Sequence, residues 1–342
     1  MSGLIPARGS PAAQRRNFSW RSPRFRSLVY QTLAVVLIGL LGWLLVSNTL
    51  ANMRLRGIQS GFDFLLQPAG FDIGEGWLKY DLTSPYWKAF LVGIVNTLRV
   101  TLIGCVLATL LGTLLGIARF SSNALVRGLS RSYVELFRNI PLLLQLLMWY
   151  LLFIEYLPLP NEALSIGKVI FLSKNGISFP SLVWEDGHAR FDFPFVGEMQ
   201  VEGGSALSPE YMAVLLALVL YTSAFIAEVV RAGIASVPRG QHEAGASIGL
   251  SRARSMRLVV LPQALRLIIP PLTNQYLNLT KNSSLAVAVG YPELVSIANT
   301  SLNQSGRAVE CIAIIMLVYL TMSLGTSALM DWFNRSAAIR ER

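Results

Sequence analysis

Apolar runs of about 20 residues recur along this chain, and each is long enough to cross the hydrocarbon core of a bilayer as a helix. Of the 342 residues, 53% are hydrophobic and only 14% are charged, which is unlike a soluble protein of this length. A backbone in lipid must satisfy its own hydrogen bonds, and a helix does so within one segment. The sequence therefore predicts an all-α integral membrane protein and argues against a large soluble enzyme.

Six membrane spans are predicted, and they lie at residues 28–50, 89–117, 141–157, 211–230, 265–289 and 308–330. The first apolar run is longer than the core of a signal peptide and has no small-residue cleavage site, so we expect it to be retained. It is a first helix ahead of the main transmembrane domain, which is predicted at 89–332. The remaining predicted segments are a basic tail at 1–27, outer loops at 51–88 and 158–209, an inner loop at 231–264, and a tail at 333–342.

Loop charges predict the orientation of these spans. The segment 119–138 carries four arginines and one glutamate, and the segment 231–266 carries six arginines and one glutamate. The segment 51–88 sums to zero and 158–209 to minus three. Cytoplasmic loops are enriched in Lys and Arg, so both termini are predicted to be cytoplasmic. The net charge of +10 then has a membrane explanation and does not indicate nucleic-acid binding.

The outer segment 158–209 has two possible interpretations. It is long, contains proline and glycine, and is partly acidic. It is either an ordered cap between two spans or a contact surface for an extracytoplasmic partner, and the sequence slightly favours the cap.

A stripe of small residues marks the second span. Gly104, Ala108, Gly112 and Gly116 recur at a spacing of four. Residues at this spacing share one helix face, and small side chains let another helix approach closely. The stripe therefore predicts a tight helix–helix contact.

The fifth span is too polar to face lipid. Asn274, Asn278 and Lys281 repeat at spacings of four and three, which places them on one helix face, and Ser283 and Ser284 follow. Such residues usually line a bundle interior or a water-filled cavity. This face is the candidate translocation path. The alternative is that the segment is only partly membranous and that Lys281 snorkels towards water.

The inner loop carries the most specific pattern in the chain. It reads Glu243-Ala244-Gly245, then Gly249, then Leu261-Pro262, with nine residues between Gly249 and Val259. This pattern resembles the E-A-A loop of the permease subunits of ATP-binding-cassette importers, with Gly245 where the second alanine is usual. In that family the loop is held by the ATPase subunit, so the resemblance implies a coupling role for these residues.

Local physics fits a two-helix elbow at this loop. Pro238 and Gly240 break the preceding helix, so we expect Glu243 in the first turn of a short one, where the helix dipole favours a carboxylate. Gly249 tolerates a positive φ at the turn.

Further motifs resemble the polar amino-acid branch of these permeases. They are Glu135 to Pro141 with Gln145, Ala227 to Ile234, and Lys281 to Leu285. The resemblance implies a type I importer (MetI-like) fold, L-amino acids as substrate, two ATPase subunits that bind ATP, a solute-binding protein, and a second permease, a sister chain rather than a copy. It also implies the bacterial inner membrane. Gln145 is a candidate residue of the translocation path, although its side chain could instead make a packing hydrogen bond. Glu228 and Arg231 are predicted to form an ion pair at a helix end.

The main alternative is a stand-alone ion-coupled secondary transporter. It would need a carboxylate deep within a span, whereas Glu155, Glu228 and Glu310 lie near predicted helix ends. The chain has no G-x-x-x-x-G-K-[ST] phosphate-binding loop, so it is predicted to be no enzyme and to bind no cofactor itself. Two histidines and two cysteines leave little for a metal site.

Overall fold

The computed structural model describes residues 22–55, 57, 60–167, 169–185, 188–198 and 200–337. Most of the predicted basic tail and residues 338–342 of the predicted second tail lie outside them. The chain divides into two units, 1–60 and 61–342. The first unit contains one helix, α1 (Pro23–Leu55), which is longer than the predicted first span at both ends. No residue in the apolar window of α1 is buried, as expected for a helix that meets lipid or another chain.

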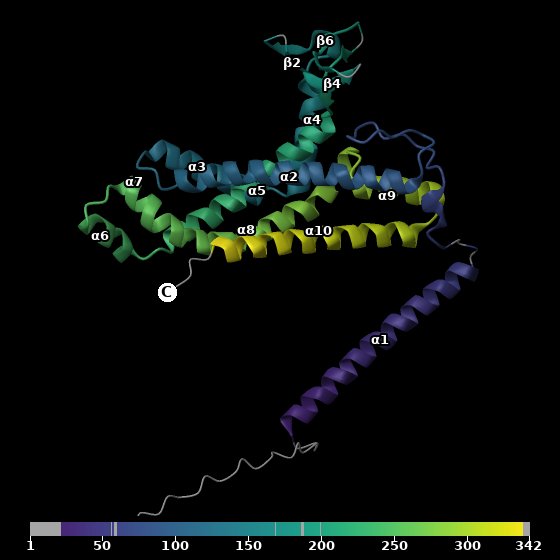
Figure 1. The fold of residues 1–342 in the computed structure, drawn as a ribbon, viewed down its shortest axis with the longest axis horizontal. Coiled ribbons are helices and arrows are strands. Elements are labelled where there is room, and N and C mark those ends of the chain that lie inside the picture. The colour runs from purple at the N-terminus through teal and green to yellow at the C-terminus, as the bar shows by residue number, and fades with distance from the viewer. Residues whose placement is uncertain are drawn as a thin grey trace, which may run out of the picture. The chain divides into compact units, whose positions relative to one another are not determined.

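The second unit is a helical bundle that carries the other predicted spans (Figure 1). Five helices of the described chain are long and apolar enough to cross a membrane, and a bent pair makes a sixth. The helices of this unit are α2 (Tyr86–Ala118), α3 (Ala124–Asn139), α4 (Leu142–Tyr156), α5 (Pro209–Ala235), α6 (Arg239–Ser247), α7 (Arg252–Ser255), α8 (Leu261–Asn282), α9 (Leu294–Ser305) and α10 (Ala308–Ala337). Short 3-10 helices lie at Asp63–Leu66, Pro160–Glu162 and Ser283–Val289.

Helix α5 forms the centre of the bundle. In its apolar window 61% of the residues are buried, more than in any other candidate span of the described chain. Its largest contact is with α2, and it also packs on α3, α4 and α8. Because α5 is enclosed by protein rather than lipid, small or polar side chains such as Ser223 and Thr222 are tolerated on it.

Gly112 and Gly116 of the small-residue stripe on α2 face α5, which confirms the predicted close contact. A Cβ atom added at Gly112 would lie 2.8 Å from the carbonyl oxygen of Ser223, and one added at Gly116 would lie 2.8 Å from that of Ala227. Ala108 is completely buried. The two helix backbones touch here, and only glycine allows that approach.

The predicted third span, 141–157, is helix α4, and a sharp bend joins it to α3, which lies in the segment 119–138 predicted as a loop. Helices α3 and α4 meet at 103° across Ile140 and Pro141. Ile140 is extended, because proline disfavours the helical conformation in the residue before it. The side-chain amide of Gln145 donates to the carbonyl oxygens of Phe137 and Ile140, both at 2.9 Å, and satisfies acceptors that the bend leaves without helical partners.

The segment 158–209 folds as short antiparallel strands, which the sequence patterns do not predict. The strands are β1 (Leu164–Ile166), β2 (Ile170–Ser173), β3 (Gly176–Phe179), β4 (Ser181–Glu185), β5 (His188–Asp192), β6 (Phe195–Val196), β7 (Val201–Glu202) and β8 (Ser205–Leu207). They form a four-stranded sheet in the order β1-β2-β3-β8 and two hairpins, β4-β5 and β6-β7. Figure 1 shows them at the end of the α4–α5 hairpin, away from α6 and α7. The fold is mostly helical, as predicted, with this strand-rich addition.

An ion pair buried beneath the segment 61–88 ties it to the bundle. Glu75 accepts a hydrogen bond from Arg99 of α2 at 2.7 Å and another from Ser208 at the start of α5. The guanidinium carbon of Arg99 lies 4.2 Å from the ring centre of Tyr211 and 5.1 Å from that of Trp77. The pair is therefore fully enclosed by partners, which a buried charge requires.

Helix α9, which the sequence analysis does not predict, is capped by a buried carboxylate. Glu293 accepts hydrogen bonds from the backbone N–H groups of Val295 and Ser296 and from the hydroxyl of Tyr319. It is 1% exposed, and burial raises its pKa to about 7 from the ordinary value of 4.5. At pH values between 4.5 and about 7, Glu293 is therefore mostly protonated in the folded protein and mostly ionised in the unfolded chain.

This pKa predicts a pH-dependent stability. The raised pKa means that Glu293 favours the fold most at pH values below about 4.5 and that this contribution is lost as the pH rises to about 7. Glu293→Gln keeps the cap acceptor and cannot ionise. We expect its thermal midpoint, relative to the parent protein, to be higher at pH 8 than at pH 5. Glu162→Gln, at an exposed carboxylate, should show the same difference at both pH values. An equal offset of Glu293→Gln at both pH values would contradict the assignment.

Candidate functional site

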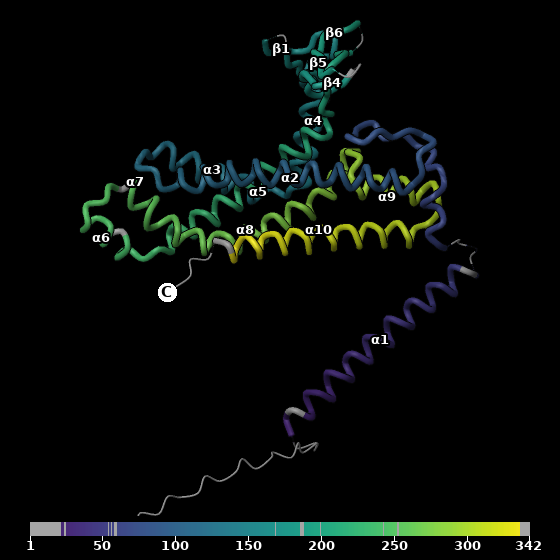
Figure 2. The backbone as a smooth tube through the Cα atoms, viewed as in Figure 1, coloured from purple at the N-terminus to yellow at the C-terminus, as the bar shows by residue number. Residues whose placement is uncertain are grey.

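Two short helices, α6 and α7, form an elbow at one end of the bundle (Figure 2). Pro238 is the N-cap of α6, and Arg239 begins the helix. Glu243 is therefore in the second turn, and the prediction of a first-turn position is wrong. Proline favours the position before or at the start of a helix, so the helix begins immediately after Pro238 rather than after Gly240.

Gly249 ends α6 in the left-handed conformation, with φ of +78°, as predicted. The N–H of Gly249 donates to the carbonyl of Ala246, and the N–H of Leu250 donates to that of Gly245. These two bonds form a Schellman motif, which satisfies the last carbonyl groups of a helix. The turn thus fixes the direction in which α7 leaves.

Gly245 lies where α6 meets α7. A Cβ atom at this position would be 2.9 Å from the hydroxyl oxygen of Ser255. That hydroxyl is buried and has no hydrogen-bond partner in the described part of the chain. Gly245, which replaces the second alanine of the E-A-A pattern, therefore allows the two short helices to approach closely.

This approach predicts that Gly245 and Ser255 are energetically coupled. Gly245→Ala gains helix propensity of up to about 1 kcal/mol but forces the Ser255 hydroxyl to move. In a Ser255→Ala background the nearest remaining atom, the Cβ of Ser255, is at 3.5 Å, which is ordinary contact. We expect Gly245→Ala to be more favourable by roughly 1 kcal/mol in that background. Thermal midpoints of the four variants form the double-mutant cycle, and additive effects would contradict the coupling.

Residues Leu261 and Pro262 begin α8 behind a π-helical turn. The turn spans Met256–Val260, and the N–H of Leu261 donates to the carbonyl of Met256, five residues back. Pro262 has no N–H, so it cannot continue the regular ladder, and it occupies the start of α8. Leu261 and Pro262 therefore join the elbow rigidly to the fifth span.

The elbow exposes a small apolar surface. Ile248 is 76% exposed, and Ala244, one helical turn earlier, is also exposed. Glu243 is exposed beside them. An apolar tip with a carboxylate next to it, on two helices fixed by a glycine turn, is suited to docking into a cleft of another protein.

The polar face of α8 lies on the surface of this chain. Asn274, Asn278 and Lys281 are all exposed on this chain. Lys281 and Ser284 line a cavity of about 510 Å³ together with Tyr319 of α10. This part of the candidate path is therefore open to whatever packs against α8.

Gln145 and Ser283 lie apart from that face. Gln145 is 1% exposed and donates to the backbone at the α3–α4 bend. Ser283 is also 1% exposed, and its hydroxyl donates to the carbonyl of Thr280 at 2.7 Å. Both side chains therefore donate hydrogen bonds to backbone carbonyl groups of this chain. For Gln145 this is the packing hydrogen bond that was the alternative to a place in the path.

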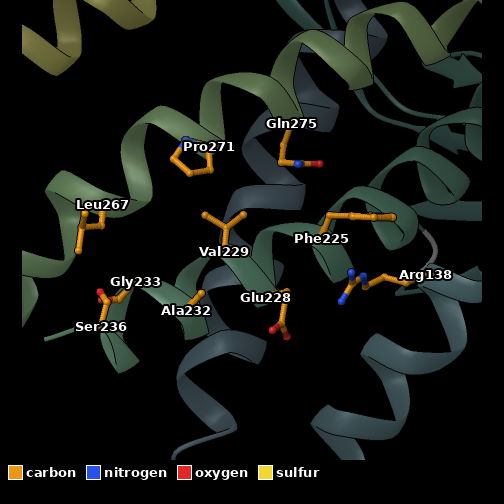
Figure 3. Close-up of a pocket in the computed structure, with 10 residues that line it drawn as sticks. All are labelled: Arg138, Phe225, Glu228, Val229, Ala232, Gly233, Ser236, Leu267, Pro271 and Gln275. Atoms are coloured by element: carbon orange, nitrogen blue, oxygen red, sulfur yellow. The ribbon is translucent and has the colours of Figure 1, made fainter.

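A second cavity, of about 360 Å³, lies between α3, α5 and α8 on the side of the elbow (Figure 3). Arg138, Phe225, Glu228 and Gln275 project towards it in the close-up. The guanidinium carbon of Arg138 lies 5.1 Å from the ring centre of Phe225. Three helices that are distant in sequence therefore place a cation, an acid and an amide around one space.

Glu228 pairs with Arg231, and also with a partner that the sequence analysis missed. Arg231 donates to one carboxylate oxygen of Glu228, its Nε at 3.0 Å, and Arg119 at the end of α2 donates to the other. Spacing along α5 could indicate Arg231 but not Arg119, which is 109 residues away. The carboxylate thus joins α2 to α5 near the C-terminal ends of both helices.

The chain is similar to one family of known transport proteins. Residues 108–339 match the family described as binding-protein-dependent transport system inner membrane component. The chain is 40% identical to the general L-amino acid transport system permease protein AapQ of Rhizobium johnstonii, over 94% of both chains. It is 42% identical to the putative amino-acid ABC transporter permease protein YhdX of Escherichia coli, over 95% of this chain and 98% of the relative.

A solved structure agrees with these relatives. The crystal structure of an amino acid ABC transporter with histidines matches with a TM-score of 0.55 and 27% identity, over 73% of this chain and 95% of the other. An inward-facing MetNI methionine ABC transporter structure has the same fold, with a TM-score of 0.52 and 18% identity. Neither the family nor these relatives support the stand-alone secondary transporter. The chain belongs to the binding-protein-dependent transport system inner membrane components, the integral inner-membrane permease subunits of ATP-binding-cassette importers.

Proposed function

We propose that this chain forms the translocation path of an importer of L-amino acids and is driven by separate ATPase subunits. The observation that carries the proposal is the elbow, in which a Schellman turn at Gly249 presents the exposed residues Glu243, Ala244 and Ile248. The amino-acid class is supported by the relatives, whose names include a general L-amino acid permease and a glutamate/glutamine/aspartate/asparagine permease of Rhodobacter capsulatus.

The proposed coupling residues are Glu243, Ala244, Gly245, Gly249, Leu261 and Pro262. Closure of an ATPase dimer would push the elbow, and the π-helical turn before Leu261 would pass the movement to α8. The polar face of α8 would then be exposed to one side of the membrane or to the other. This is a population shift between two states of the bundle, driven by preferential ATPase binding to one of them.

Both termini are proposed to be cytoplasmic. The support is the excess of arginine in 119–138 and 231–266, together with the net charge of zero in 51–88 and of minus three in 158–209. In Figure 1 the elbow lies at one end of the bundle and α9 at the other, as two opposite membrane faces require. The strand-rich segment 158–209 would then lie outside the cell membrane, as a cap or as a contact surface for a binding protein.

The partners proposed are two ATPase subunits, an extracytoplasmic binding protein and a second permease. A sister permease is favoured over a second copy of this chain. Escherichia coli O6:H1 has two relatives, the glutamate/aspartate import permease proteins GltJ and GltK, which are 31% and 30% identical to this chain. Two distinct permease chains that are named for the same substrates are the pattern expected of a heterodimer.

The test is purification of the tagged chain from its native membranes in mild detergent, followed by mass spectrometry and an ATPase assay. We expect an ABC ATPase subunit and a second permease in the eluate, with hydrolysis stimulated by a binding protein loaded with an L-amino acid. Recovery of the chain by itself, without ATPase activity after gentle extraction, would contradict the proposal. Recovery of a single permease type with the ATPase would reject only the sister permease.

A further inference from the structure

The cavity between α3, α5 and α8 has an excess of positive charge. Glu228 supplies the one carboxylate among the residues that line it, and that carboxylate is already paired with both Arg119 and Arg231. Arg138 also lines the cavity and makes no ion pair within the part of the chain that the structure describes. An anionic group that entered would therefore be attracted rather than repelled.

The contact of Arg138 with Phe225 leaves its hydrogen-bonding edge available. The guanidinium carbon lies over the aromatic ring, 5.1 Å from its centre, which is within the range of a cation–π contact. The N–H groups of a guanidinium lie in its plane, and two of them match the two oxygens of a carboxylate. Arg138 is thus held against Phe225, and within the part of the chain that the structure describes its N–H groups make no hydrogen bond or ion pair that would compete with an anion.

The rest of the cavity suits the other parts of an amino acid. Gln275 of α8 offers an amide oxygen as an acceptor for an ammonium group. Val229, Ala232 and Leu267 provide an apolar wall. The volume of about 360 Å³ is sufficient for one amino acid of ordinary size.

We infer that Arg138 binds the α-carboxylate of the transported amino acid on the inner half of the path, with Phe225 holding the guanidinium in place. This inference rests on the proposed function, because it takes the substrate class from it. It assigns a substrate contact to a residue outside the polar face of α8. It also predicts that anionic and zwitterionic amino acids are bound more tightly than cationic ones, because the cavity retains a net positive charge.

The test measures whether Arg138 and the carboxylate act on each other. The purified complex is titrated at pH 6.5 with L-glutamine and with L-glutaminamide, which keeps the ammonium group but replaces the α-carboxylate by a neutral amide. We expect the parent complex to bind L-glutamine roughly ten- to hundred-fold more tightly, as for a charge-assisted hydrogen bond. In Arg138→Gln that preference should disappear through weaker L-glutamine binding, and in Arg138→Lys it should shrink.

Arg131→Gln is the matched control, because Arg131 lies on the same helix, is 70% exposed and pairs with Glu135 at 2.8 Å. It should keep the full preference for the carboxylate. Basal ATPase activity of each complex reports that the variant is assembled.

Different results would contradict the role of Arg138 and the proposed importer of L-amino acids. Equal loss of both ligands in Arg138→Gln, or no loss, would overturn the role of Arg138 while leaving the importer intact. If the parent complex, with active ATPase, bound neither L-glutamine nor L-glutamate, the substrate class itself would be wrong, and this inference would fail with it.

Discussion

Gly249→Val is expected to reduce ATP-driven uptake at least about tenfold while leaving the amount of permease in the membrane unchanged. Gly249 has φ of +78°, and the left-handed conformation costs a residue with a side chain roughly 1–2 kcal/mol. A Cβ atom at Gly249 would meet nothing within 4 Å, so the substitution strains the turn without a clash in the fold. The elbow would be redirected, and its docking orientation would be populated roughly tenfold less.

Two variants test this reason for the loss. Gly240→Val is the matched control. Gly240 lies in the first turn of α6, the helix that ends just before Gly249, and a Cβ atom there would also meet nothing within 4 Å. Unlike Gly249, it has no positive φ. Gly240→Val should lose little uptake. Gly249→Asn should retain most of the uptake, because asparagine tolerates the left-handed conformation. The measurement is uptake of a labelled amino acid into vesicles, normalised to permease content. Equal losses in the two valine variants would show that the glycine turn is not what matters.

Gly112→Val should prevent correct assembly of the bundle and lower the level of folded permease severalfold. A Cβ atom at this position would lie 2.8 Å from the carbonyl oxygen of Ser223 and 2.7 Å from the Cβ of Ile226. A backbone carbonyl cannot rotate away, so α2 and α5 would have to separate. Overpacking typically costs 1–3 kcal/mol, and these two helices share the largest contact in the bundle.

Gly128→Val is the control for this second prediction, because Gly128 is also within a helix but meets nothing within 4 Å. Fluorescence-detected gel filtration of the tagged protein measures the folded fraction. We expect a single symmetric peak for Gly128→Val and a reduced or aggregated one for Gly112→Val. Ile226→Ala should not rescue Gly112→Val, since the Ser223 carbonyl would remain. Normal assembly of Gly112→Val would mean that the two helices can part without cost.

Features that depend on residues close together in the sequence could be predicted from the sequence alone. Apolar runs identify the spans because the bilayer fixes their length, and the glycine stripe identifies a helix face because four-residue spacing does so in any helix. Gly249 could be assigned a positive φ because glycine adopts it without cost. The position of Glu243 was missed by about one turn, because Pro238 and Gly240 both allow a helix to begin and only one of them does.

Contacts between distant segments needed the tertiary structure. Arg119 meets Glu228, and Arg138 stacks on Phe225, only because α2, α3 and α5 pack at particular heights and angles. The 103° bend between α3 and α4, held by Gln145, joins the predicted third span to a helix within the segment 119–138, which was predicted as a loop. The strands in 158–209 were not predictable, because they are two to five residues long and pair through the backbone.

The sequence by itself therefore determined the class of protein and the place of the elbow, since these depend on hydrophobic length and on glycine and proline. Which face of each helix is buried against which neighbour was decided only by the tertiary structure. The cavity around Arg138 belongs to that second group, because its charge results from side chains on separate helices. Such a balance of charges is a property of packing in three dimensions, and no spacing along one helix contains it.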